Sequence, residues 1–403
     1  MANGAFENLD LGPDPGTDPR NPAPDLDGGG VGPTSGWLIA LLILAAVGVT
    51  GLAVWLLPRA GGRGPVPIAV RLGLVTASQV TLILAVAAGV NANFLFFVSW
   101  SDLFGTTSGT GQFRGASVSG PAAIRPLVRK VSPLGAGSGL RPGMVDGRLE
   151  DVTVEGVRTG IEAHAFVYLP RQYFDPAAKD RRFPVSLVLA GYPGDPRGII
   201  KRQGLLRDAS TAMANGSVQP TIYVIMKATV VPPRDTECTD VPAGPQVETF
   251  FSQDVPQAVA ATYRTAAAPH GWGVIGQSTG GYCAVKLAAR HSDRFGAAAS
   301  LGGYLRSVQD PTTGDLYGGS RQVRDENDLI WRLEHLPPPP VAVLLAQTEQ
   351  GPDFDQAQRY AALAKPPLRL TTLFPKDGGH NLRTFQRLTP DLLKWMSGQQ
   401  RAG

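Results

Sequence analysis

The segment 276–280, with the sequence GQSTG, constrains the fold of this chain more than any other feature. The apolar run 272–275 precedes it and a helical pattern over 282–291 follows it. A serine in a strained turn between strand and helix needs small neighbours two residues away, because larger side chains would clash there. The glycines at both ends of the segment meet that need. The segment therefore predicts a strand, a sharp turn with Ser278 at its apex, and a helix.

The sequence around this turn, from residue 146 to about residue 400, alternates short β-like runs with helical stretches. This alternation is typical of an α/β fold. Runs such as SLVLA and VAVLLA are apolar on both faces, as central strands covered by helices on both sides are. We expect one α/β domain over 146–400, with strands at 149–157, 163–169, 185–190, 221–226, 272–275, 297–301, 341–346 and 368–374.

A histidine in a suitable place, His380, follows the last expected strand on a glycine-rich loop. A histidine can take the proton of a reactive serine, and an acid then orients the imidazole. The chain order serine, acid, histidine is the one that α/β hydrolases use. The loop after the seventh strand supplies the acid, and position favours Glu349, with Asp353 and then Asp355 as alternatives. The sequence thus predicts a serine hydrolase with the triad Ser278, Glu349 and His380.

An oxyanion hole requires two backbone N–H donors aimed at the reacting carbonyl oxygen. Thr279 directly follows the reactive serine, and its N–H is the first expected donor. The second should come from the loop 191–194, after strand 185–190. Because Pro193 has no N–H, Tyr192 is the natural donor in this loop.

The catalytic domain, from about residue 147 to 397, resembles the esterase branch of the α/β-hydrolase superfamily. That branch includes esterase D-like enzymes, feruloyl esterases and mycolyltransferases. The resemblance rests on FVYLP at 166–170, LAGY at 189–192, GQSTGG at 276–281, RHSDRF at the end of the next helix, and the pair Gly379-His380. An N-terminal anchor before such a domain is similar to actinobacterial envelope esterases.

The resemblance implies the α/β-hydrolase fold, a mostly parallel sheet flanked by helices, and a triad that maps onto Ser278, Glu349 and His380. The chain departs from the pattern at 190–191, where Ala-Gly replaces the His-Gly of many esterases, and at Gln347, which is often glycine. Three functions remain: a carboxylesterase, an acyltransferase that passes the acyl group to a sugar or lipid hydroxyl, and an inactive binding module. An ester or other acyl donor is the expected substrate of the first two.

Composition argues against two other classes of function. Five histidines without an H-x-x-x-H pair and two cysteines offer no metal-site spacing, so neither a metal nor another cofactor is expected. The net charge of +4 is spread thinly and forms no basic stripe with interleaved aromatic residues. Nucleic-acid binding is therefore not expected.

Two apolar runs lie before the domain. Residues 37–57 carry no charge, and a helix of that length spans roughly 30 Å, the thickness of the bilayer hydrocarbon. Residues 74–98 are also uncharged. Both are predicted transmembrane helices, and a secretory signal peptide is the alternative interpretation. We accordingly expect the lipid bilayer as a partner and the cell membrane as the location.

The segments flanking these runs predict their orientation. The connection 58–71 contains three arginines and no acid, so the positive-inside rule places it in the cytoplasm and both chain ends outside. Residues 1–36 are acidic and rich in proline and glycine, which predicts a disordered tail. Residues 99–145 are rich in glycine and serine and are expected to form a linker.

The two cysteines, Cys238 and Cys283, come from different parts of the domain. Cys283 lies five residues after Ser278, and Cys238 lies on the long loop after strand 221–226. An extracellular domain allows a disulfide to persist, so we expect a bridge between them. A buried Cys283 and a free Cys238 thiol are the alternative.

Overall fold

The computed structural model describes residues 32–33, 35–94, 100–103, 112–113, 128–131, 145–232 and 234–403. Most of the predicted tail 1–36 and most of the predicted linker 99–145 lie outside these residues.

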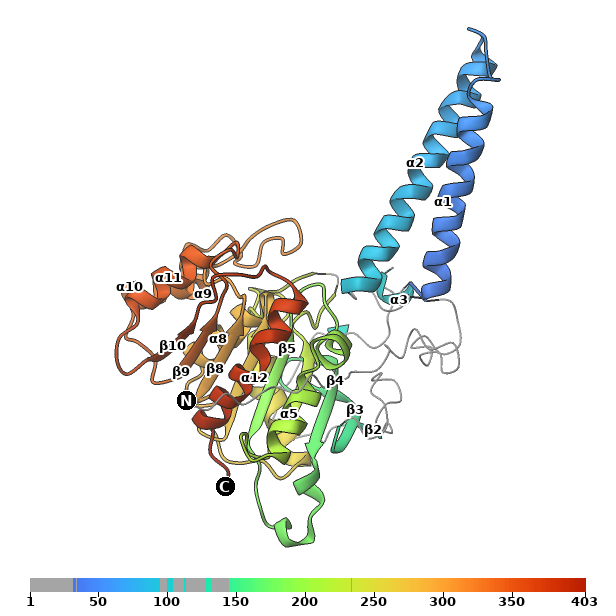
Figure 1. Cartoon of the computed structure of the whole chain (residues 1–403). Coiled ribbons are helices and arrows are strands. Elements are labelled where there is room, and N and C mark those ends of the chain that lie inside the picture. The colour runs from blue at the N-terminus through green and yellow to red at the C-terminus, as the bar shows by residue number, and fades with distance from the viewer. Residues whose placement is uncertain are drawn as a thin grey trace, which may run out of the picture.

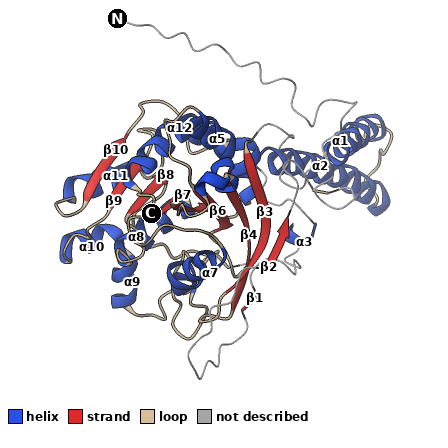
Figure 2. Cartoon of the chain, turned by 90° about the horizontal axis from the view of Figure 1, so that it is seen from below, coloured by secondary structure: helices blue, strands red, loops and turns tan. Residues whose placement is uncertain are grey.

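One mixed sheet crosses the domain in the order β10-β9-β8-β7-β5-β6-β4-β3-β2, with β1 beside β4 (Figures 1 and 2). The six strands from β10 to β6 in this order are parallel, whereas β4, β3, β2 and β1 pair antiparallel. Each of the eight predicted strands is present, as β3 to β10. The strands are β1 (Gln112–Phe113), β2 (Val128–Val131), β3 (Gly147–Glu155), β4 (Ile161–Pro170), β5 (Val185–Ala190), β6 (Ile222–Lys227), β7 (Trp272–Gln277), β8 (Ala297–Leu301), β9 (Ala342–Ala346) and β10 (Arg369–Leu373).

Helices and single helical turns connect these strands. They are α3 (Trp100–Leu103), η1 (Arg171–Phe174), η2 (Pro176–Ala178), α4 (Pro196–Gly198), η3 (Ile199–Gln203), α5 (Leu205–Ala214), α6 (Val247–Thr249), η4 (Phe250–Asp254), α7 (Val255–Thr262), α8 (Thr279–Arg290), α9 (Arg321–Asn327), α10 (Leu329–His335), α11 (Phe354–Leu363) and α12 (Leu382–Gln399).

Alternation along the strands divides the core into two layers. In β5, Leu187 and Leu189 face the layer that contains α7, α8, α10 and α11. Val188 and Ala190 face the opposite layer, which contains α5 and α12. Figure 2 shows α12 and α5 on one side of the sheet and α7 on the other. Because all parallel strands end at the same edge of the sheet, the loops that follow β5, β7, β9 and β10 gather at that edge.

The helices α1 (Gly36–Leu56) and α2 (Pro65–Phe94) form a hairpin beside the domain (Figure 1). Both are long and apolar enough to cross a membrane, by length and composition. Their side chains lie mostly outside any packed core, and Trp37 is 85% exposed. At the open end of the hairpin, Asn91 donates a hydrogen bond to the Pro33 carbonyl at 3.3 Å.

The second helix begins earlier than residue 74, where the sequence analysis expected it. Pro65 suits a first helical turn, since its missing N–H needs no partner there. The Arg71 guanidinium donates to the Pro67 carbonyl at 3.2 Å, which ties the charged residue to the preceding turn. The first part of the expected connection 58–71 thus remains a turn, and its last part is helical. The end expected at residue 98 lies outside the described residues.

Two short strands lie within the predicted linker 99–145. The strand β2 pairs with β3, and β1 pairs with β4. The antiparallel edge of a sheet presents unpaired N–H and C=O groups, which such segments can satisfy. Parts of the expected linker are therefore strands of the domain sheet.

Candidate active site

Ser278 lies in the turn between β7 and α8, with φ 53° and ψ −126°. A side chain rarely adopts a positive φ, so the surrounding structure must hold this residue in place. A Cβ on Gly276 would lie 1.8 Å from the Gly280 carbonyl oxygen, and one on Gly280 would lie 2.1 Å from the Leu189 carbonyl oxygen. Both glycines are therefore required for the turn to fit between strand and helix.

His380 meets Ser278 from the loop that follows β10. Its Nε2 lies 3.0 Å from the Ser278 hydroxyl oxygen, within hydrogen-bond distance. The imidazole packs edge-on against the ring of Phe385, with ring centroids 5.4 Å apart. Gly302, at φ +63°, leaves room for both rings, because a Cβ there would lie 2.9 Å from Phe385 and 3.1 Å from His380 Nδ1. Such a pair can transfer a proton from hydroxyl to imidazole.

The environment of His380 favours the neutral imidazole. Partial desolvation lowers the pKa of His380, and the negative charge of Asp353 opposes this shift. Burial in turn raises the pKa of Asp353, while the charge of His380 lowers it. A histidine that is neutral near pH 7 can accept a proton, as a general base must.

The three candidate acids differ in their exposure and in their hydrogen bonds. Asp353 is half-buried just before α11, and it accepts a hydrogen bond from Gln356 at 2.9 Å. Glu349 is exposed, and its backbone N–H donates to the Pro375 carbonyl at 3.0 Å. Within the described residues, no carboxylate oxygen forms a hydrogen bond with His380, and Asp353 is the acid whose charge acts on its pKa. Asp355 is exposed in the first turn of α11 and raises the pKa of Asp353.

The two expected oxyanion donors, the N–H groups of Thr279 and Tyr192, belong to segments that adjoin the serine. Thr279 begins α8, and the first N–H groups of a helix have no acceptor within that helix. The loop after β5 packs directly on the turn, because a Cβ on Gly191 would lie 2.8 Å from the Gln277 carbonyl oxygen and 2.9 Å from Ser278 Cβ. Tyr192 follows Gly191 in this loop.

The two cysteines form a disulfide that ties a loop to α8. Their Cα atoms are 5.7 Å apart, and 45 residues separate them in sequence. Cys238 and Glu237 have φ angles of 49° and 50°. The bridge thus holds a strained loop segment against the helix that begins beside Ser278.

Two residues near the serine were missed by the sequence analysis. The Tyr304 hydroxyl forms a hydrogen bond with the Glu237 carboxylate and lies 3.2 Å from Thr279 Oγ1. One signal could have found Glu237, since it precedes Cys238 and the expected bridge brings that loop to α8. Tyr304 lies three residues after β8, in a loop whose pattern carries no comparable signal.

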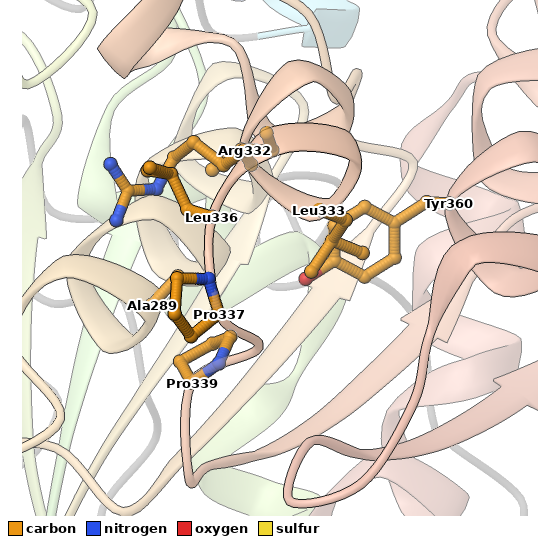
Figure 3. A pocket seen from close by; sticks show the side chains of 8 residues that line it. Ala289, Arg332, Leu333, Leu336, Pro337, Pro339 and Tyr360 are labelled. Carbon is orange, nitrogen blue, oxygen red and sulfur yellow. The ribbon is translucent and has the colours of Figure 1, made fainter.

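Two small cavities lie at different distances from the serine. One of about 10 Å³, lined in part by Ala289, Leu333 and Tyr360, lies at the far end of α8, roughly 16 Å from Ser278 along the helix (Figure 3). Another of about 10 Å³ lies beside His380 and is lined in part by Gln347, which is 3% exposed. Each has room for about one water molecule. Among the described residues, no group of three or more His, Cys, Asp or Glu side chains is placed to hold a metal ion.

Comparison with protein families identifies the domain. A family model described as "Putative esterase" matches residues 156–369, more than half of the chain. The match contains β4 to β9 and ends at the start of β10. It includes Ser278, Asp353 and Glu349, and it ends before His380.

The curated relatives match over shorter stretches. The MPT51/MPB51 antigen of Mycobacterium tuberculosis is 40% identical over 77 residues, which are 19% of this chain and 25% of the antigen. An uncharacterized protein of Corynebacterium glutamicum is 25% identical over 171 residues, 41% of this chain and 39% of that protein. The chain thus spans well under half the length of either relative.

Solved structures share the fold at low sequence identity. An S-formylglutathione hydrolase from Agrobacterium tumefaciens has a TM-score of 0.56 and 14% identity, covering 69% of this chain and all of the hydrolase. A ferulic acid esterase has a TM-score of 0.53 and 18% identity, covering 64% of this chain and all of the esterase. These likenesses support the α/β-hydrolase fold expected from the sequence. The chain belongs to the family described as "Putative esterase", and its domain has the α/β-hydrolase fold.

Proposed function

We propose that this chain is a serine esterase that hydrolyses carboxylic esters through an acyl-enzyme on Ser278. The observation that carries the proposal is the 3.0 Å approach of His380 Nε2 to the Ser278 hydroxyl, at a strained turn that only flanking glycines allow. A serine hydroxyl is a weak nucleophile until an adjacent base takes its proton.

The reaction follows from this arrangement. Ser278 Oγ attacks the ester carbonyl carbon while His380 Nε2 takes the hydroxyl proton. The N–H groups of Thr279 and Tyr192 stabilise the oxyanion of the tetrahedral intermediate. The protonated imidazole gives its proton to the departing alkoxide, and the acyl group stays on Ser278. A water molecule then attacks the acyl-enzyme while His380 takes its proton. The imidazolium returns this proton to Ser278 Oγ as the bond to the acyl group breaks, and the carboxylic acid leaves.

The acid of this triad is Asp353 rather than Glu349. Asp353 is the half-buried acid whose charge raises the pKa of His380, as a group that stabilises the imidazolium must. Catalytic hydrogen bonds are often long in free enzymes and tighten when substrate binds, so Asp353 need not contact the imidazole in this state.

The hairpin of α1 and α2 anchors the enzyme in a membrane, with the catalytic domain outside the cell. The length and apolar surface of the two helices support the anchor. Arg59 and Arg63 at the turn, with Arg71 near the start of α2, support its cytoplasmic position. In Figure 1 that turn is the part of the hairpin farthest from the domain.

Turnover of a panel of acyl esters tests the proposed reaction, with the Ser278→Ala variant as blank. We expect wild-type enzyme to release free carboxylic acid and the variant to release none above background. Added sugar or lipid alcohols separate hydrolysis from transfer. If the acyl group appears on the alcohol in preference to water, the enzyme is an acyltransferase. Equal turnover by both proteins would contradict the proposal.

A further inference from the structure

The buried loop that contains Cys238 brings a carboxyl group close to the serine. Glu237 is 3% exposed, and its backbone N–H donates to Asp235 at 3.1 Å. On the other side, the fully buried Lys286 of α8 donates to the Glu237 carbonyl at 2.5 Å. The disulfide to Cys283 adds a covalent tie between this loop and α8. These hydrogen bonds and the bridge therefore fix the backbone of Glu237 against α8.

That side chain connects to the residue after Ser278. The Tyr304 hydroxyl bonds to the Glu237 carboxylate and lies 3.2 Å from Thr279 Oγ1. The Tyr304 ring stacks on Tyr282 of α8, with centroids 5.1 Å apart and planes 24° apart. Glu237, Tyr304 and Thr279 thus form a hydrogen-bonded chain that ends at a proposed oxyanion donor.

We propose that Glu237 is a positioning residue of the oxyanion hole, which acts through Tyr304 on Thr279 and which the disulfide holds in place. This inference rests on the proposed function, because it assigns the Thr279 N–H to the oxyanion. Neither Glu237 nor Tyr304 touches the reacting atoms in this proposal. A substitution that breaks the hydrogen bonds between Glu237, Tyr304 and Thr279 should therefore lower kcat and leave KM nearly unchanged, since the oxyanion forms only in the transition state.

The direction of hydrogen-bond donation from Glu237 through Tyr304 to Thr279 depends on whether Glu237 is protonated. A hydroxyl group donates a single hydrogen, so Tyr304 cannot donate to both neighbours at once. When Glu237 is protonated, it donates to the Tyr304 oxygen, and Tyr304 donates to Thr279 Oγ1. When Glu237 is ionised, Tyr304 donates to it, and Thr279 must donate its own hydroxyl hydrogen to Tyr304. Ionisation of Glu237 thus reverses the direction of both hydrogen bonds and adds a negative charge near the oxyanion.

The surroundings favour the protonated form near neutral pH. Burial raises the pKa of Glu237 to about 8, the negative charge of Asp235 adds to this rise, and the Tyr304 bond and Lys286 oppose it. Asp310 also raises it. Since the pKa is raised, the neutral form prevails below about pH 8 and is lost above it. We therefore expect kcat to fall as the pH rises through about 8.

Glu237→Gln and Tyr304→Phe test this inference in the oxidised full-length protein. The matched control is Glu150→Gln, because Glu150 is also buried and accepts a bond from Tyr263 at 2.7 Å, but it lies on β3, four strands from β7. We expect Glu237→Gln to keep most of the neutral-pH rate and to lose the alkaline fall in kcat. Tyr304→Phe should lower kcat about tenfold at constant KM. Glu150→Gln should keep the wild-type pH profile.

Two outcomes would overturn the inference. One is an alkaline fall that persists in Glu237→Gln, and the other is a Tyr304→Phe variant with a raised KM and an unchanged kcat. Fluorophosphonate labelling of Ser278 in each variant shows that the site is folded. If wild-type Ser278 is not labelled, the proposed function itself is wrong. If Ser278 is labelled and the pH profiles contradict the expectation, only the role of Glu237 is wrong.

Discussion

In the proposed reaction, the protonation state of His380 decides whether Ser278 can react. Partial desolvation lowers the pKa of the imidazole, which keeps its Nε2 free to accept the serine proton. The 3.0 Å contact is then a bond that a neutral base can use. Phe385 and Gly302 shape the space around the ring, so the position of His380 depends on packing as well as on the acid.

A pH profile of kcat/KM tests the lowered pKa. The reactive form is neutral, so the rate should rise with pH as His380 loses its proton. Because the pKa is lowered, the midpoint of this rise should lie below the usual histidine value of about 6.5. A midpoint well above that value would contradict the account of the His380 environment.

Paired substitutions test the acid. Asp353→Asn should lower the rate roughly 10²–10⁴-fold, as removal of the orienting carboxylate does in comparable triads. It should also move the acidic limb of the profile to lower pH, because Asp353 raises the pKa of His380. Glu349→Gln is the matched control and should change neither. The reverse result would restore Glu349 as the acid.

Loops at one edge of the sheet bring the site elements together. In the proposed site, Ser278 comes from the turn after β7 and Tyr192 from the loop after β5. Asp353 comes from the loop after β9 and His380 from the loop after β10. The strands hold these loops in register, so the spacing of the site depends on strand pairing. The disulfide adds a further constraint from the loop after β6.

Removal of the disulfide should destabilise the domain. The bridge closes a loop of 45 residues, which corresponds to about 4 kcal/mol in the loop-entropy model. The double variant Cys238→Ser with Cys283→Ser leaves no unpaired thiol. Urea unfolding should show a lower free energy of unfolding for this variant than for the wild type. Equal midpoints and slopes would contradict the stabilising role.

Strand and turn positions could be predicted because their signals are local. Apolar runs mark β5, β7 and β9, and the glycines around Ser278 mark the turn. The acid of the proposed triad depends on how the loop after β9 folds, and a local sequence pattern does not predict that fold. Position in sequence therefore favoured Glu349, whereas the folded loop leaves Glu349 exposed and brings the charge of Asp353 to His380. The hydrogen bonds that link Glu237, Tyr304 and Thr279 likewise depend on contacts between segments that are distant in sequence.

At the scale of the whole molecule, an apolar hairpin accompanies a domain of the esterase family. Exposed side chains such as Trp37 and Leu44, 85% and 72% exposed, are costly in water and favourable in lipid. The sequence predicted both helices from length and composition. The predicted start of α2 was too late in the sequence, because a charged residue such as Arg71 is typical of a loop. In the structure, the Arg71 guanidinium donates a hydrogen bond to the helix backbone.

Protease added to intact cells tests the proposed orientation. We expect the catalytic domain to be digested, because both ends of the hairpin face outward in the proposal. Permeabilised cells are the control and should show digestion in either orientation. Protection of the domain until permeabilisation would reverse the topology.

The most direct test of the central claim is the site at which a fluorophosphonate probe attaches to the full-length protein. Only a serine with an activating base should react rapidly with this probe. Mass spectrometry of the digested protein should find the adduct on Ser278, and the Ser278→Ala variant should stay unlabelled while it keeps its far-UV circular dichroism spectrum. An adduct on a different residue, with Ser278 unmodified in the folded protein, would contradict the account.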